Sequence, residues 1–291
     1  MPALLAAGHE VTGTTRSSER AGAIAGAGAT PVLVDAFDAR ALARAVAAAR
    51  PDAVVNQLTD LPHAPSVRGI KAAYAANNRA RGEGGANLLA ATRAAGVERY
   101  LAQSVTFFCR PTGAPGLRDE DTPLWTDAPG MIGEAARVVD HTERDALAAG
   151  GVVLRYGFLS GPGTWYAHDS AIAALVRKRR FPIVGEGAGV YSFVHVDDAA
   201  AATVAALDAS AAIYNVTDDH PAPTSTWLRA FAPALGAKPP RRIPRPVLTL
   251  AGAGALAAWQ ESLEGADNAR AKPVMGWTPV HATWRTGFRD P

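Results

Sequence analysis

Side chains that can exchange protons or line a pocket gather just after an apolar run in the middle of the 291-residue chain. Residues 152–154 are β-branched or leucine, typical of a buried parallel strand, and the Gly-Pro-Gly at 161–163 marks a tight turn. Ligands of open α/β sheets sit outside the carboxyl ends of the strands, so this stretch predicts a small-molecule site. The candidate substrate-binding residues are Ser160, Trp165, Tyr166 and His168. Tyr156 is a candidate catalytic residue; it, Tyr166 or His168 could supply a proton, or could simply line the pocket.

The elements that would position these side chains are short apolar runs alternating with alanine-rich helical runs. Strands are expected near 9–15, 30–34, 52–58, 99–104, 152–156, 191–196 and 213–216. Long helices are expected at 71–95 and 131–149. This alternation predicts an α/β fold with a parallel sheet. We expect residues 1–160 and 189–216 to build the sheet domain, and 161–188 with 217–291 to build a smaller substrate lobe.

Composition excludes several kinds of partner. A formal charge of +2 with scattered Lys and Arg argues against nucleic acid. The longest uncharged apolar run, 247–259, is shorter than the ~20 residues of a membrane span and predicts a helix packed inside the second lobe. The single cysteine, Cys109, cannot form an internal disulfide, which fits a reducing cytoplasm. No spacing of His, Cys and Asp indicates a metal site.

An ordered set of weak motifs carries a family resemblance. It consists of Arg16 after one strand, Asp35 after the next, Gln103-Ser104 after another, Gly-Pro-Gly at 161–163, and Phe-Val-His-Val-Asp-Asp at 193–198. The set resembles the extended or atypical short-chain dehydrogenases/reductases, which are NAD(P)-dependent epimerase/dehydratase-like proteins. The resemblance implies a Rossmann-like, doubly wound parallel sheet with a small C-terminal substrate lobe.

The resemblance also implies cofactor contacts. Arg16 matches the place where a basic side chain meets the 2′-phosphate of NADP, so NADPH is favoured over NAD; a solvated arginine at a helix start is the alternative. The other implied contacts are Ser17 or Ser18 to the same phosphate, Asp35 beside the adenine, and Leu58 and Thr59 along the nicotinamide ribose.

The implied active site departs from the family pattern. Ser104 matches the residue whose hydroxyl holds a substrate oxygen, although capping a strand end is the alternative. The family pairs a tyrosine with a lysine four residues later, and the lysine lowers the tyrosine pKa. No tyrosine lies between Tyr100 and Tyr156, and no lysine between Lys71 and Lys178. The usual proton-transfer pair is therefore missing.

Glu134 lies roughly where the tyrosine should be, and it is the candidate replacement acid or base. Glu134 and His141 are seven residues apart, so a helix would carry them on one face. A solvated helix face is the alternative, because charged residues surround both. His195 is interpreted as a structural strand histidine.

The N-terminal region departs from the family as well. Family members begin with a strand and a glycine-rich turn that holds the cofactor pyrophosphate. No such turn precedes Gly8, and the central strand is missing. The neighbouring strands would then have unpaired amides. Either the true start lies upstream, which is favoured, or the fold has reclosed; without the loop, cofactor binding would be impaired.

Three functions follow as hypotheses. The first is a cytoplasmic NADP-dependent enzyme of the epimerase/dehydratase/reductase type, acting on a carbonyl or hydroxyl of a small molecule. The second is a non-redox sensor or scaffold that binds ligand or cofactor. The third is a cofactor-independent isomerase or lyase using Glu134, Tyr156 or His168. The helices at 71–95 and 131–149 are the expected interface of a homodimer.

Overall fold

Four parallel strands form the largest sheet of the computed structural model, which describes residues 1–62, 69–250 and 253–288. Their order is β10 (Ile213–Val216), β5 (Val152–Tyr156), β4 (Arg99–Val105) and β3 (Ala53–Asn56). Every residue of β5 is buried, as a strand covered on both faces requires. Ser104 of β4 is registered opposite Arg155 of β5, so their side chains point to the same face of the sheet. The expected α/β fold with a parallel sheet is confirmed.

A second, separate pair of parallel strands consists of β1 (Thr12–Thr15) and β2 (Thr30–Leu33). Within the described residues, β1 pairs only with β2, and β3 pairs only with β4. The gap expected where the central strand is missing therefore lies between β1 and β3, and these two strands do not pair with each other. One side of each strand is left without a ladder partner in the described part of the chain.

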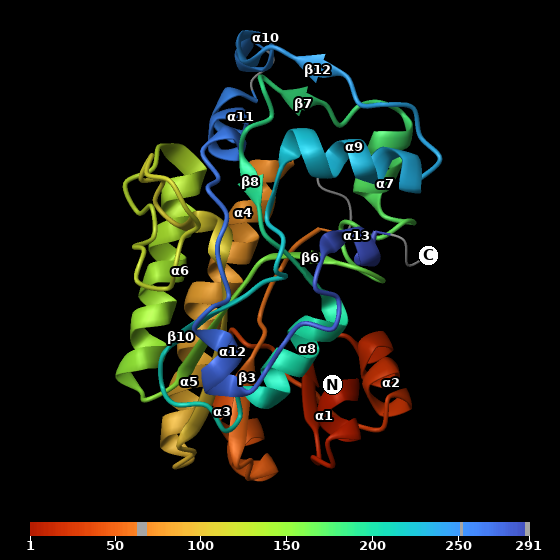
Figure 1. Cartoon of the computed structure of the whole chain (residues 1–291). Coiled ribbons are helices and arrows are strands. Elements are labelled where there is room, and N and C mark those ends of the chain that lie inside the picture. The colour runs from red at the N-terminus through yellow and green to blue at the C-terminus, as the bar shows by residue number, and fades with distance from the viewer. Residues whose placement is uncertain (63–68, 251–252, 289–291) are drawn as a thin grey trace.

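Helices cover both faces of this sheet region (Figure 1). One side carries α3 (Ala39–Ala49), α4 (Ile70–Arg79), α5 (Gly85–Ala94) and α6 (Gly130–Ala148), and the other carries α1 (Pro2–Ala6), α2 (Ser18–Gly26) and α8 (Val196–Ala205). A π-helical turn, Ala80–Gly84, joins α4 to α5. The long helix predicted at 71–95 is thus present, with its glycine-rich stretch forming the turn.

A second group of small elements lies beyond the carboxyl end of the sheet, in the upper half of Figure 1. β6 (Phe158–Ser160) pairs with β9 (Phe193–His195) and leads toward this group. The other elements of this group are η2 (Thr106–Phe108), α7 (Ala171–Arg177), β7 (Ile183–Val184), β8 (Val190–Tyr191), β11 (Ala222–Pro223), α9 (Thr224–Ala234), β12 (Arg242–Ile243), α10 (Arg245–Leu250), α11 (Gly254–Glu261) and α13 (Trp284–Gly287). The chain returns to the sheet domain at α12 (Ala271–Met275), which packs against β10. Just after α12, Trp277 Nε1 donates a hydrogen bond to the carbonyl of Asp198 in α8 (3.1 Å).

The prediction of one packed helix at 247–259 is wrong in its first part. α10 ends at Leu250 and α11 begins at Gly254, while residues 251 and 252 lie outside the described residues. Leu250 is 90% exposed, whereas Trp259 of α11 is buried. The apolar residues run through 247–259 without interruption, so the sequence pattern does not show that α10 and α11 are separate helices. In the described part of the chain, no helix combines the length and apolar character needed to cross a membrane.

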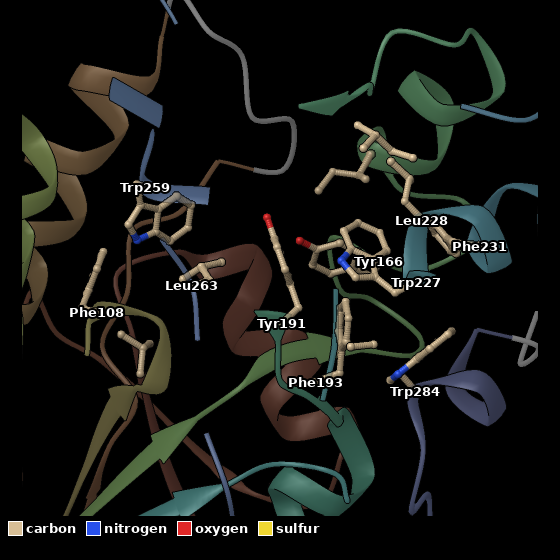
Figure 2. Close-up of a cluster of buried hydrophobic side chains, with 14 of the residues drawn as sticks. Phe108, Tyr166, Tyr191, Phe193, Trp227, Leu228, Phe231, Trp259, Leu263 and Trp284 are labelled. Carbon is tan, nitrogen blue, oxygen red and sulfur yellow. The ribbon is translucent and has the colours of Figure 1, made fainter. Parts of the chain in front are cut away.

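A cluster of aromatic side chains fills the space between the sheet and the upper elements (Figure 2). Trp227 and Phe231 of α9, both fully buried, pack beside Phe193 of β9. Buried aromatic side chains each remove a large apolar area from water, so this cluster is a main source of stability for the junction. It also forms the surroundings of the candidate site.

Candidate functional site

A small cavity of about 20 Å³ lies past the carboxyl end of β4 and at the start of β6. Its lining residues are Thr106, Phe107, Cys109, Arg118, Phe158, Val190, Ser192, Leu263, Glu264 and Gly265. The rings of Phe107 and Phe158 are stacked with centroids 4.5 Å apart. Burial raises the pKa of the Cys109 thiol to about 11, so this thiol is protonated at neutral pH and is a poor nucleophile. The cavity lining therefore combines stacked aromatic rings with a protonated thiol.

An ion pair closes one side of the cavity. Arg118 Nε lies 3.4 Å from Glu264 Oε2, and both side chains are largely buried. Glu264 also accepts hydrogen bonds from the backbone amides of Thr112 (2.8 Å) and Gly113 (2.7 Å). Arg118 donates to the carbonyl of Gly116 (2.6 Å). The pair thus fixes the loop at 112–118 over the cavity and leaves this wall electrically neutral.

Ser104, the predicted substrate-holding serine, is fully buried. Its hydroxyl donates a hydrogen bond to Glu143 of α6, and Arg155 of β5 donates to both oxygens of that carboxylate (2.8 and 2.6 Å). The structure thus places the Ser104 hydroxyl against α6. Thr106, two residues further along, lines the cavity instead. The prediction missed this threonine, although its position just past the strand end was a signal.

The predicted Glu134 lies on the exposed side of α6. His141, which shares this side, is paired with Asp145 (3.4 Å) and is mostly exposed. On the buried side of α6, Ala135 and Val139 have the four-residue spacing of a tyrosine–lysine pair, and they are 2% and 1% exposed. The structure therefore does not bring Glu134 to the cavity, because the helix turns it to solvent. A tyrosine–lysine pair is absent from the inward face of α6.

Tyr156 is buried at the end of β5, where its hydroxyl has two partners. It lies 2.7 Å from the Thr203 hydroxyl of α8 and accepts a hydrogen bond from Gln57 Nε2 (3.3 Å). Burial raises the Tyr156 pKa despite these bonds. The hydroxyl is thus held toward α8 and does not readily release its proton.

Ser160 and His168 lie on either side of the predicted tight turn. The turn is confirmed at Gly161, which has φ +94° and where a Cβ would lie 2.3 Å from His195 Nε2. The Ser160 hydroxyl donates to the Val194 carbonyl (3.4 Å). His168 Nε2 is bonded to the Phe288 carbonyl (2.6 Å). Both predicted substrate residues therefore have backbone partners.

Trp165 and Tyr166 have different surroundings. Trp165 Nε1 donates to the carbonyl of Pro62 (3.0 Å), in the segment that follows β3. Tyr166 lies in the aromatic cluster, with its ring edge-on to Phe193 (5.2 Å) and Trp227 (5.6 Å). Of the two, Tyr166 therefore lies with the aromatic side chains next to the cavity.

The predicted cofactor residues gather at the carboxyl ends of β1, β2 and β3. Arg16 after β1 faces Asp60 after β3, with 3.4 Å between Nη2 and Oδ2. Both side chains are substantially exposed, so this pair is weak and the guanidinium is available to a phosphate. The Ser17 hydroxyl caps α2 by accepting from the Arg20 amide (3.3 Å). These contacts fit the phosphate-bearing end of an adenine nucleotide.

The segments after β2 and β3 also meet. Asp35 Oδ1 accepts from the Phe37 amide (3.0 Å), which orders the turn that would face an adenine. A Cβ on Gly84 would lie 3.4 Å from both Ala36 Cβ and Leu58 Cδ1, so these segments lie against the π-helical turn. Thr59 follows directly. The predicted adenosine and ribose contacts therefore lie on segments that follow strands of two separate sheets and meet at the π-helical turn.

The parallel sheet with helices on both faces, and its likeness to solved structures, define a Rossmann-like fold. The chain belongs to the NAD dependent epimerase/dehydratase family, whose model matches residues 1–217. Its function is thus NAD(P)-dependent epimerase/dehydratase/reductase-like.

Individual relatives agree. The chain is 43% identical over 295 residues to a 3-diazoavenalumate denitrifying reductase from Streptomyces sp., covering 98% of this chain and 93% of the relative. Among solved structures, it resembles the UDP-glucose 4-epimerase of Thermotoga maritima (17% identity, TM-score 0.74, 98% and 90% of the two chains). It also resembles the UDP-glucose 4-epimerase of Thermus thermophilus in complex with NAD (24% identity, TM-score 0.72, 98% and 91%). The two epimerases support the fold.

Proposed function

We propose that this chain is an NADPH-dependent reductase that delivers a hydride to a small aromatic molecule without a proton from an enzyme acid. The observation that carries the proposal is the inward face of α6, where Ala135 and Val139 take the places available to a tyrosine–lysine pair. A carbonyl reduction needs a proton for the new alkoxide. A substrate whose leaving group departs as a neutral molecule needs none.

Reductive loss of nitrogen from an aromatic diazonium is such a reaction. The C–N bond breaks with its electron pair going to nitrogen, a C–H bond forms from the hydride, and N₂ leaves without a proton. The oxidant is the diazonium and the reductant is the nicotinamide, which supplies the hydride when bound. The Streptomyces relative is named for reductive removal of nitrogen from a diazo compound, which supports this substrate class.

The cavity residues suit a diazonium substrate. The stacked rings of Phe107 and Phe158 make one side of the cavity apolar. The Arg118–Glu264 pair adds no net charge that would repel a cation. The Thr106 hydroxyl is the group placed to orient the substrate.

We assign the cofactor contacts to the strand-end residues. Arg16 would pair with the 2′-phosphate of NADP, since its only ion-pair partner among the described residues is the exposed Asp60 at 3.4 Å. Asp35 would lie beside the adenine, with Leu58 and Thr59 along the nicotinamide ribose. On this assignment NADPH binds more tightly than NADH.

Calorimetric titration tests the cofactor assignment. The wild-type chain should bind NADPH more tightly than NADH, and Arg16→Glu should weaken NADPH binding at least tenfold while changing NADH binding much less. Arg93→Gln, at an exposed position of α5, is the matched control. Equal binding of both nucleotides by the wild type would contradict the role of Arg16, and binding of neither would contradict the reductase proposal.

A further inference from the structure

A second small cavity lies on the helical side of the sheet and shares no lining residue with the cavity of the candidate site. Its lining comes from β3, β4, the π-helical turn and the helices α5 and α6. Its volume is about 20 Å³. Because a single buried water needs about 10–15 Å³, the space fits one water or one monatomic anion.

Arg81 lines this cavity from the π-helical turn, and the residue is only 8% exposed. Within residues 1–62, 69–250 and 253–288, its Nε and Nη1 atoms are buried and have no hydrogen-bond partner. A buried donor without a partner costs free energy, and the cost is larger when the group is charged. The site therefore favours an acceptor that the described part of the chain does not supply.

The positive charge of Arg81 also lacks a carboxylate of its own. Burial lowers the Arg81 pKa to about 10, so the group stays protonated at neutral pH. The carboxylate whose charge acts on Arg81 is Glu143. That carboxylate is already bonded by Ser104 and, through two hydrogen bonds, by Arg155. A water in the cavity would satisfy the free N–H groups of Arg81, but it would leave the buried charge without a counter-charge.

The other polar groups of the lining accommodate an anion. The Tyr100 hydroxyl accepts a hydrogen bond from Asn56 Nδ2 (2.9 Å), which leaves its own hydrogen to donate. Gln103 Oε1 is buried without a partner among the described residues, and a 180° turn of its amide presents the NH₂ group in its place. Asp145 is partly exposed, and its carboxylate pairs with His141 on the exposed side of α6 (3.4 Å).

We propose that this cavity binds one monovalent anion of the size of chloride, with the Arg81 guanidinium as the main donor and counter-charge and Tyr100 as a further donor. Leu58 lines the same cavity, so the anion lies next to the segment that we assign to the nicotinamide ribose. The anion would also hold the π-helical turn, because that turn carries Arg81. The inference does not depend on the reductase proposal.

Crystals of the full chain grown with sodium bromide test the site directly, because bromide takes the place of chloride and scatters X-rays anomalously. The proposal predicts an anomalous peak beside the Arg81 guanidinium. Density at that place without an anomalous signal would identify an ordered water and overturn the proposal, and so would an empty cavity.

Thermal unfolding tests the site in solution. Sodium chloride is compared at equal ionic strength with sodium gluconate, whose anion is too large for the cavity. Chloride should raise the melting temperature relative to gluconate by at least ~2 °C more in the wild type than in Arg81→Met, which removes the charge. Arg93→Gln, at an exposed position of α5, is the control and should respond as the wild type does.

An equal response of the wild type and Arg81→Met to chloride would overturn the proposal, even with a bromide peak, because binding would then occur at crystal concentration only. If Arg81→Met does not fold, Arg81→Gln replaces it in the same comparison, and the bromide crystals use the wild type in any case. Neither measurement involves NADPH or turnover, so its failure is distinguishable from failure of the reductase proposal.

Discussion

Glu143 of α6 accepts two hydrogen bonds from Arg155 of β5 in the protein interior, at 2.8 and 2.6 Å. Both residues are at most 4% exposed. Ser104 of β4 adds a third bond to the same carboxylate, so one buried acid ties two central strands to α6. The same helix, α6, has Ala135 and Val139 on its buried side in place of a tyrosine–lysine pair.

Breaking this tie should destabilise the fold strongly. Arg155→Leu leaves Glu143 buried without its charged partner, and we expect the free energy of unfolding to fall by about 3–5 kcal/mol. Denaturant unfolding followed by circular dichroism measures the loss. The matched control is Arg144→Leu, which removes the exposed pair with Asp140 and should cost about 0.3–0.5 kcal/mol. Equal losses in the two variants would show that the buried pair has no special role.

The two hydroxyls at the exit of β4 should differ in effect. Ser104→Ala removes a hydrogen bond to a buried carboxylate, and its main effect should be a loss of about 1.5–3 kcal/mol of stability. Thr106→Val should lower the turnover rate with less effect on stability, since Thr106 lines the cavity. Unfolding curves and initial rates on both variants check this. If Ser104→Ala lost activity while keeping its stability, the original assignment of Ser104 to the substrate would be favoured.

Asp218 should make stability depend on pH. It accepts hydrogen bonds from the amides of Trp284 (2.5 Å) and His220 (3.1 Å), yet burial raises its pKa to about 7. The pKa of Asp218 is higher in the folded state than in the unfolded state, so the protonated side chain contributes to the free energy of unfolding. This contribution is fully present below about pH 4. That contribution is lost as pH rises to about 7.

Asp218→Asn removes this titration, so wild type and variant are compared by denaturant unfolding at pH 5 and pH 8. Relative to the wild type, Asp218→Asn should be more stable at pH 8 than at pH 5. Asp219→Asn is the control, because the Asp219 pKa is lowered beside Lys272 and lies below this range. A stability difference between Asp218→Asn and wild type that is the same at both pH values would rule out this titration.

The sequence predicted the strands and helices well because their apolar periods and glycine punctuation are local features. The split between β1 and β3 also followed from a local observation, the missing glycine-rich turn. The site was harder, since the direction of each side chain depends on tertiary packing. The sequence alone did not resolve that the pleat of β4 turns Ser104 toward Glu143, or that the phase of α6 turns Glu134 to solvent.

The cavity residues Arg118 and Glu264 were not predicted for the same reason. They are 146 residues apart in sequence and meet only because the C-terminal part of the chain returns to the loop at 112–118. Homodimer formation through α4, α5 and α6 stays a prediction, as do the assignments of the individual cofactor and substrate residues.

The measurement that tests the central claim most directly uses NADPH deuterated at the transferable position of the nicotinamide, with benzenediazonium as the substrate. The account predicts that one deuterium appears on the ring carbon that carried nitrogen, with one N₂ released per NADPH oxidised. It also predicts little dependence of the rate on solvent deuterium, because no solvent proton enters the bond being formed. Nitrogen release without NADPH oxidation, or a product whose new hydrogen comes from water, would contradict the account.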